Sequence, residues 1–185
     1  ILRDFRELNP RIDLELTVAQ SSALRGRVES GHLDVALVKV DAGETSGILI
    51  RRERMCWSAI TALHLEPEQP LPLVIYQAPS LSRNRAVAAL ERIGRAYRVT
   101  CTVRGVNGLL AAARAGLGVA VFTRSLMPED LVELPAAANL PELGKVDLVL
   151  LKSTRAAPER VEALSQAILH SGPPISSRPR ARVLR

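Results

Sequence analysis

The chain has 185 residues, enough for one domain or two small lobes, and its 47% hydrophobic and 24% charged residues are ordinary for a globular protein. Only five residues are aromatic, which argues against a site built on stacked rings and against a single-strand nucleic-acid platform. The net charge of +6 includes four arginines within residues 173–185, so the remainder carries +2, with acids mixed among its cations. We therefore expect a solvated surface rather than a nucleic-acid-binding face.

Three further features bear on where the chain acts. Cys56 and Cys101 are its only cysteines, and we expect reduced thiols in a cytoplasmic protein, with a redox switch as the alternative. Arg114 interrupts the longest apolar run, so no segment reaches the ~18 apolar residues of a membrane span. Residues 1–5 lack the layout of a signal peptide, and we expect them to lie within a longer chain.

The first forty residues predict a βαβ unit. Apolar residues at helical spacing predict a helix over residues 1–8 that ends before Pro10, and the alternation in residues 12–18 predicts a half-buried strand. Ser21 or Ser22 is expected to cap the next helix, which ends at Gly31, and residues 34–38 follow as an apolar strand. The two strands would be parallel, with a right-handed crossover.

The rest of the chain repeats this β/α logic. A strand is predicted at 48–61, and the proline-rich segment 66–72 is a connection. Beyond it the pattern predicts strands at 73–76, 99–103, 119–122 and 146–151, and helices at 82–97, at 107–115 with Asn107 as cap, and from Pro158 onward.

These elements predict an α/β protein of two lobes joined by a hinge. Lobe I is expected to be discontinuous, with residues 1–62 and 148–172, and lobe II to hold residues 63–147. Residues 173–185 are basic and poor in apolar side chains, which predicts a disordered tail.

The sequence carries no pattern that predicts catalysis. His32, His64 and His170 lack metal-ligand spacing, and neither a serine-nucleophile elbow nor a phosphate loop is present. The two glycines in residues 116–118 end a helix and lack the third glycine of a dinucleotide site, because Val121 stands there. We therefore expect no enzyme activity, no cofactor and no metal.

Several short motifs resemble the effector-binding domain of LysR-type transcriptional regulators. Leu2, Phe5 and Pro10 match the opening helix of that family. Ser21 and Leu24, followed by residues 31–34 (Gly-His-Leu-Asp), match its next unit, and residues 115–120 (Ala-Gly-Leu-Gly-Val-Ala) match its later signature. The likeness spans residues 1–172, and residues 71–74 with the second half are most similar to regulators of the LrhA/HexA kind.

The resemblance implies a fold like the type 2 periplasmic binding proteins, with a ligand between the lobes. The chain departs from the family pattern at residues 122–124, where a proline is common, and at residues 19–20, where a glycine is usual. Both places lie near the expected pocket, so the ligand cannot be transferred from a relative.

Physical reasoning supports the same location. In α/β lobes, ligands gather at the carboxyl ends of strands, beside helix N-termini whose free N–H groups favour anions. We therefore expect a small anionic or polar metabolite to contact residues at these positions: Gln20, Ser21, Ser22, Lys39, Gln77, Ser80, Arg104, Val106, Asn107, Phe122 and Thr123. For the two serines helix capping is the alternative role, and for Arg104 it is a solvent-facing charge.

The resemblance also implies partners. It predicts a homodimer that pairs the helix near 21–30 of one domain with the helix near 82–97 of another, a tetramer in the full-length regulator, and DNA contact only through an N-terminal helix-turn-helix domain outside this chain. Two rivals remain, an extracytoplasmic solute-binding protein and an enzyme on the same fold. A signal sequence upstream would favour the first, and an acid–base pair in the cleft the second.

Overall fold

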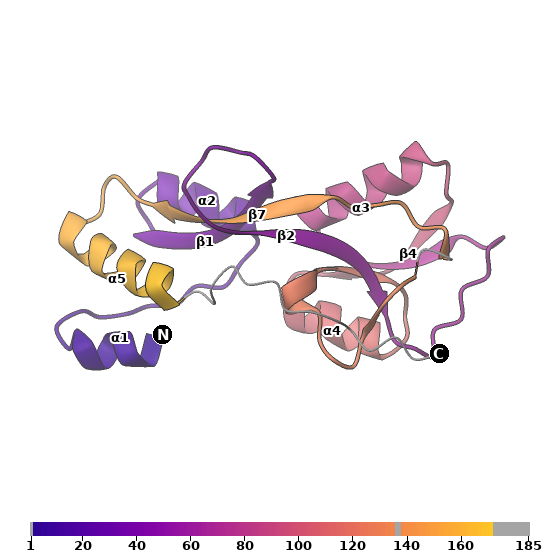
Figure 1. The fold of residues 1–185 in the computed structure, drawn as a ribbon, viewed down its shortest axis with the longest axis horizontal. Helices are drawn as coiled ribbons and strands as arrows, with labels where there is room; N and C mark the ends of the chain where they lie inside the picture. The colour runs from indigo at the N-terminus through magenta and orange to yellow at the C-terminus, as the bar shows by residue number, and fades with distance from the viewer. Residues whose placement is uncertain (1, 136–137, 172–185) are drawn as a thin grey trace.

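Two long strands connect the two ends of the molecule. They are β2 (Ile48–Ala59) and β7 (Lys145–Lys152), which pair antiparallel and run through the middle of the view in Figure 1. The structure, a computed structural model, describes residues 2–135 and 138–171. The main sheet has the order β1-β7-β2-β5, so β2 and β7 belong to both lobes.

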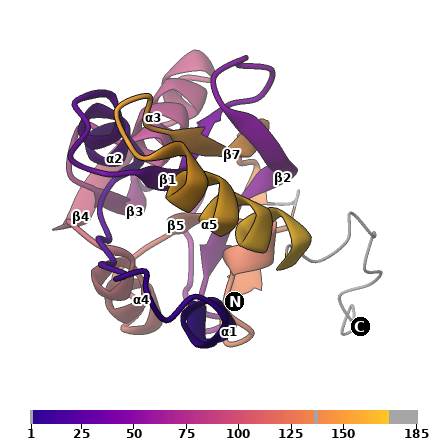
Figure 2. The ribbon, with the colours of Figure 1, turned by 90° about the vertical axis from the view of Figure 1, so that its left-hand side faces the viewer.

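The first lobe is built on β1 (Val35–Asp41), which pairs antiparallel with β7. Helix α2 (Ser21–Glu29) packs on this sheet, where the core contains Val28, Val38 and Val149. Helices α1 (Leu2–Leu8) and α5 (Pro158–Ser171) lie at the same end of the molecule (Figures 1 and 2).

The second lobe has helices on both sides of its strands. β3 (Leu71–Tyr76) and β4 (Tyr97–Val103) are parallel, and a bridge between Leu73 and Val119 brings β5 (Ala120–Thr123) alongside β3. Helix α3 (Leu81–Arg92) packs on one core and helix α4 (Val106–Arg114) on another. The short helix η1 (Arg124–Leu126) and strand β6 (Val132–Glu133) follow β5.

The strand predicted at residues 12–18 is wrong. This segment pairs with no strand among the described residues, and its Leu16 and Val18 side chains are 73% and 81% exposed. The parallel βαβ unit predicted for the first lobe is therefore absent, and β1 pairs with β7 instead. The parallel unit predicted for the second lobe is confirmed in β3, α3 and β4.

Three predicted helix boundaries also need correction. The residue that precedes α2 is Gln20, and Ser21 lies inside the helix. Gly105 precedes α4, so Asn107 belongs to its first turn. Helix α3 ends at Arg92 because Gly94 turns the chain with a φ of +67°, a backbone conformation that glycine adopts without steric cost.

The two-lobed α/β class is confirmed, whereas the residue boundaries of the lobes stay a prediction. The tail predicted at 173–185 lies outside the described residues. Over residues 2–135 and 138–171, none of the helices has the length and hydrophobicity needed to cross a bilayer. Within the same ranges, histidine, cysteine and carboxylate side chains form no group able to hold a metal.

Candidate functional site

Three of the predicted residues form a chain of hydrogen bonds from one lobe to the other. Gln20, just before α2, donates its Nε2 to the carbonyl oxygen of Arg104 at 3.2 Å. The Arg104 guanidinium then donates its Nε to Gln77 Oε1 at 3.1 Å. Because Gln77 follows β3 and Arg104 follows β4, the carboxyl ends of these parallel strands meet the start of α2.

The start of α2 is also fixed to β1. The Oγ of Ser21 accepts a hydrogen bond from the backbone N–H of Lys39 at 3.0 Å. This bond uses Ser21 to join two elements of the first lobe rather than to cap its own helix, for which no side-chain bond is formed. Lys39 and the N-terminal turn of α2 are therefore neighbours.

A cluster on β2 that we did not predict adds a second connection. Glu53 Oε2 accepts from both the N–H and the Oγ of Ser125 in η1, at 3.2 and 2.5 Å. Arg51 forms an ion pair with the Glu53 carboxylate and donates its Nη2 to Ser125 Oγ at 3.2 Å. The Glu53 side chain is only 10% exposed. Its carboxylate is held by Arg51 of β2 and by Ser125 of η1.

Lys39 adds a positive charge to this cluster, because Lys39 of β1 and Arg51 of β2 both pair with Leu148 of β7 and so flank the same residue. Burial lowers the pKa of Lys39, the nearby Glu53 charge acts in the opposite direction, and the Arg51 charge lowers it further. In the parts of the chain that the structure describes, its ammonium has no hydrogen-bond or ion-pair partner. Lys39, Arg51, Glu53 and Ser125, which we call the β2 cluster, thus hold two positive charges and one negative.

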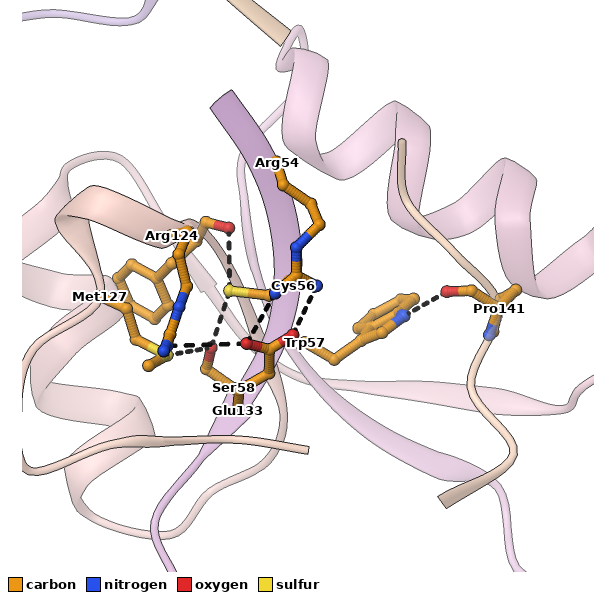
Figure 3. Close-up of polar contacts among 9 residues, drawn as sticks. Arg54, Cys56, Trp57, Ser58, Arg124, Met127, Glu133 and Pro141 are labelled. Carbon is orange, nitrogen blue, oxygen red and sulfur yellow. Dashed lines mark hydrogen bonds and ion pairs between the residues drawn. The ribbon is translucent and has the colours of Figure 1, made fainter. Parts of the chain in front are cut away.

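Farther along β2, a second ion network fixes the strand within the second lobe (Figure 3). Arg54 donates two hydrogen bonds to the Glu133 carboxylate, at 2.5 and 2.9 Å, and Arg124 lies 3.6 Å from the same group. Trp57, the only tryptophan, donates its indole N–H to Pro141 O at 2.7 Å. These bonds hold β2 where it leaves the first lobe.

Figure 3 also shows the surroundings of Cys56. Its Sγ lies 3.6 Å from Ser58 Oγ and 3.5 Å from the carbonyl oxygen of Phe122, while Ser58 donates to Met127 Sδ at 3.1 Å. Burial raises the pKa of the Cys56 thiol. A thiol that is buried and protonated is a poor nucleophile, which disfavours the redox-switch alternative at Cys56.

Another arginine joins the lobes on a different element. Arg85 of α3 forms an ion pair with Asp41 at the end of β1 and donates to Leu143 O at 2.9 Å. This pair is partly exposed, since the Asp41 side chain is 65% accessible. It ties β1 to α3 independently of the β2 cluster.

The other predicted residues have different environments. Ser80 caps α3 by accepting from Arg83 N at 3.5 Å. Phe122 packs in the core under α4 and is 5% exposed. The Thr123 hydroxyl is buried with no hydrogen-bond partner in the described residues. The remaining three are exposed and occupy the first turns of α2 and α4: Ser22, Val106 and Asn107.

A large cavity lies elsewhere. It has a volume of about 1430 Å³ and is lined by α1, residues 10–19, the Val35–Leu37 edge of β1 and part of α5. None of the predicted ligand residues borders it. Its lining combines aliphatic side chains with charged and polar ones from α1 and residues 13–17, none of which belongs to the predicted site: Arg3, Arg6, Glu7, Asp13, Glu15 and Thr17.

Sequence reasoning named Lys39 but missed the other members of the β2 cluster, Arg51, Glu53 and Ser125, for an identifiable reason. The mixed charges of residues 51–54 favour a solvated surface. In the structure Arg52 pairs with Asp147, Arg54 with Glu133, and Arg51 with Glu53. The length of the strand predicted at 48–61 could have revealed this cluster. A strand of that length can run from one lobe to the other, which brings its charged residues to the junction.

Comparisons with known proteins agree with this architecture. Residues 1–172 match the family described as the LysR substrate binding domain. The chain is 30% identical over 163 residues to the HTH-type transcriptional regulator DgdR of Burkholderia cepacia, covering 88% of this chain and 55% of that protein. It is 21% identical over 168 residues to PecT of Dickeya dadantii (strain 3937), covering 91% and 53%. The chain thus spans about half the length of these curated relatives.

Solved structures show the same fold at low identity. The regulatory domain of the HypT M206Q mutant from Salmonella typhimurium aligns with a TM-score of 0.70 and 14% identity, covering 92% of this chain and 90% of that one. The CcmR regulatory domain from Synechocystis PCC6803, solved in complex with 2-PG, aligns with a TM-score of 0.65 and 13% identity, covering 94% and 90%.

Proposed function

This chain belongs to the LysR substrate-binding domain family, and we propose that it senses a small effector for a DNA-binding transcriptional regulator. The observation that carries the proposal is the set of polar bonds between lobes at the strand carboxyl ends. Gln20 contacts Arg104, and Glu53 contacts Ser125, in each case across the junction. A metabolite that bound there would exchange these internal bonds for its own.

The proposed mechanism is a shift between two lobe arrangements. The arrangement described above is closed by protein side chains, and the effector would favour a different one. A ligand can shift such an equilibrium only by binding the two states with different affinity. A coupling of about 1–3 kcal/mol between effector and DNA sites is typical of regulation. The domain would contribute binding only, with no catalysis, cofactor or metal.

The proposed partners follow from the family. A second copy would pack α2 against α3, the full-length protein would form a tetramer, and DNA would be bound by an N-terminal helix-turn-helix domain in the bacterial cytoplasm. Light scattering coupled to size-exclusion chromatography of the purified chain tests the dimer. A monomer at all concentrations up to the millimolar range would contradict that part of the proposal.

Sensing is tested by titrating a metabolite panel and measuring the melting temperature, then confirming hits by calorimetry. We expect Gln20→Ala and Ser21→Ala to weaken a confirmed hit, because both residues lie at the lobe junction. Ser30→Ala at the other end of α2 is the matched control and should leave its affinity unchanged. Equal affinity in all three variants would show that the ligand binds elsewhere.

A further inference from the structure

The β2 cluster contains one more positive charge than its internal partners neutralise. Glu53 is fully engaged, because one carboxylate oxygen contacts Arg51 and the other accepts two hydrogen bonds from Ser125. Lys39 therefore has no carboxylate of its own. Its ammonium is largely desolvated and, among the described residues, has no direct partner. Charges in such surroundings are unfavourable unless they are paired.

Two kinds of neutral donor lie on elements next to this cluster. The Lys39 backbone is bonded to Ser21 at the start of α2, a helix of nine residues whose first N–H groups face an anion favourably. The Thr123 hydroxyl, two residues before Ser125, is 2% exposed and has no described partner. A buried hydroxyl without a partner is costly and is commonly explained by a missing water or ligand.

We propose that the effector carries a single carboxylate, which binds between the Lys39 ammonium and the Arg51 guanidinium. This inference rests on the proposed sensor function and names the ligand class of the same junction. A monoanion would bring the formal charge of Lys39, Arg51 and Glu53 to zero. A dianion would leave a net negative charge beside the buried Glu53 carboxylate, and a neutral ligand would leave Lys39 unpaired.

Binding at this position is coupled to the lobes through Arg51. That guanidinium contacts Glu53 and also donates to Ser125 in the other lobe. An incoming carboxylate competes with Glu53 for the same cation and repels it. Glu53 is therefore the internal competitor of the ligand carboxylate. Binding of the ligand weakens the hydrogen bonds between Glu53 and Ser125.

The experiment uses the 185-residue chain and simple probes. Propionate and benzoate are titrated against their neutral counterparts, propionamide and benzamide, with inorganic phosphate as the anion of higher charge. Binding is followed by NMR shifts of the Ser125 amide and the Arg51 Nε–H. The variants are Lys39→Gln, Glu53→Gln and, as a charge-matched control, Lys145→Gln at an exposed position of β7.

We expect the carboxylates to shift both signals and the amides not to. Lys39→Gln should weaken the carboxylates about tenfold or more, the loss of one charge-assisted contact. Lys145→Gln should leave them unchanged, and Glu53→Gln should strengthen them by removing the competitor, an effect that a structural role of Glu53 would not produce.

Other outcomes separate the two proposals. Amides that bind as well as carboxylates, or a Lys39→Gln variant that behaves like Lys145→Gln, would overturn the carboxylate site. If a neutral metabolite then bound with a dependence on Gln20, the sensor function would stand without it. Failure of every charged and neutral compound to bind at the junction would overturn both.

Discussion

Replacing Gly118 with alanine should separate β5 from β3 and destabilise the second lobe. A Cβ at this position would lie 2.5 Å from the carbonyl oxygen of Pro72, about 0.9 Å inside ordinary van der Waals contact. Relief requires movement of the backbone that carries two hydrogen bonds, Val119 N to Pro72 O and Val74 N to Val119 O, at 2.8 and 2.9 Å. Weakened bonds of this kind and overpacking together should cost about 2–5 kcal/mol of unfolding free energy.

The assay is urea unfolding followed by fluorescence of Trp57, the only tryptophan, whose side chain is buried. Gly26→Ala is the matched control, because Gly26 lies within α2 and a Cβ there meets no atom within 4 Å. Alanine at an exposed helical position should stabilise by about 1 kcal/mol. A Gly118→Ala variant within about 1 kcal/mol of the wild type would refute the steric reasoning.

Three further predictions concern other parts of the fold. Leu90→Ala, in α3 and 0% exposed, should lower the unfolding free energy by about 2–5 kcal/mol, measured by the same urea assay; a smaller loss would mean that the core refills the space. Hydrogen bonds from Arg52 and from Gly43 N–H lower the pKa of Asp147 from 3.8 to about 2. The bonds to the ionised Asp147 therefore stabilise the fold above pH 3.8, and this stabilisation is lost as pH falls towards 2. Asp147→Asn should flatten that part of a curve of unfolding free energy against pH. An unchanged slope would contradict the attribution of the pH dependence to Asp147. A thiol reagent at pH 8 should modify the half-buried Cys101 first and the buried Cys56 only on unfolding, as peptide mass mapping would show; the reverse order would contradict the burial of Cys56.

The spacing of apolar residues predicted most helices and strands, because helices and strands repeat their apolar residues with different periods. β3, α3 and β4 satisfy their pattern with neighbours close in sequence. Residues 12–18 have an equally clear alternation, but alternation specifies which face is apolar and not which strand is the partner. β1 pairs with β7, more than a hundred residues away, and such non-local pairings cannot be inferred from the period of one segment.

The proximity of candidate site residues could be predicted only where topology determines position. Gln77 and Arg104 follow β3 and β4, so the carboxyl-end rule located them together, whereas Gln20 was expected after a strand at residues 12–18 that the fold lacks. Phe122 lies in β5, whose four residues are all buried, and the carboxyl-end rule does not say which of them could reach a ligand. Glu53 and Ser125 are joined across 72 residues by side-chain bonds, which only the folded chain brings together.

The position of β1 at the end of its sheet has a practical consequence. Unpaired strand edges are templates for pairing with another chain, and here Leu37, 42% exposed, lines the large cavity formed with α1 and residues 10–19. We therefore expect concentrated preparations to self-associate through this strand edge. A Leu37→Lys substitution would place a positive charge at this edge, which opposes pairing with a second copy, and would leave the buried Ala36 and Val38 unchanged. It is therefore the first variant to prepare for crystallisation.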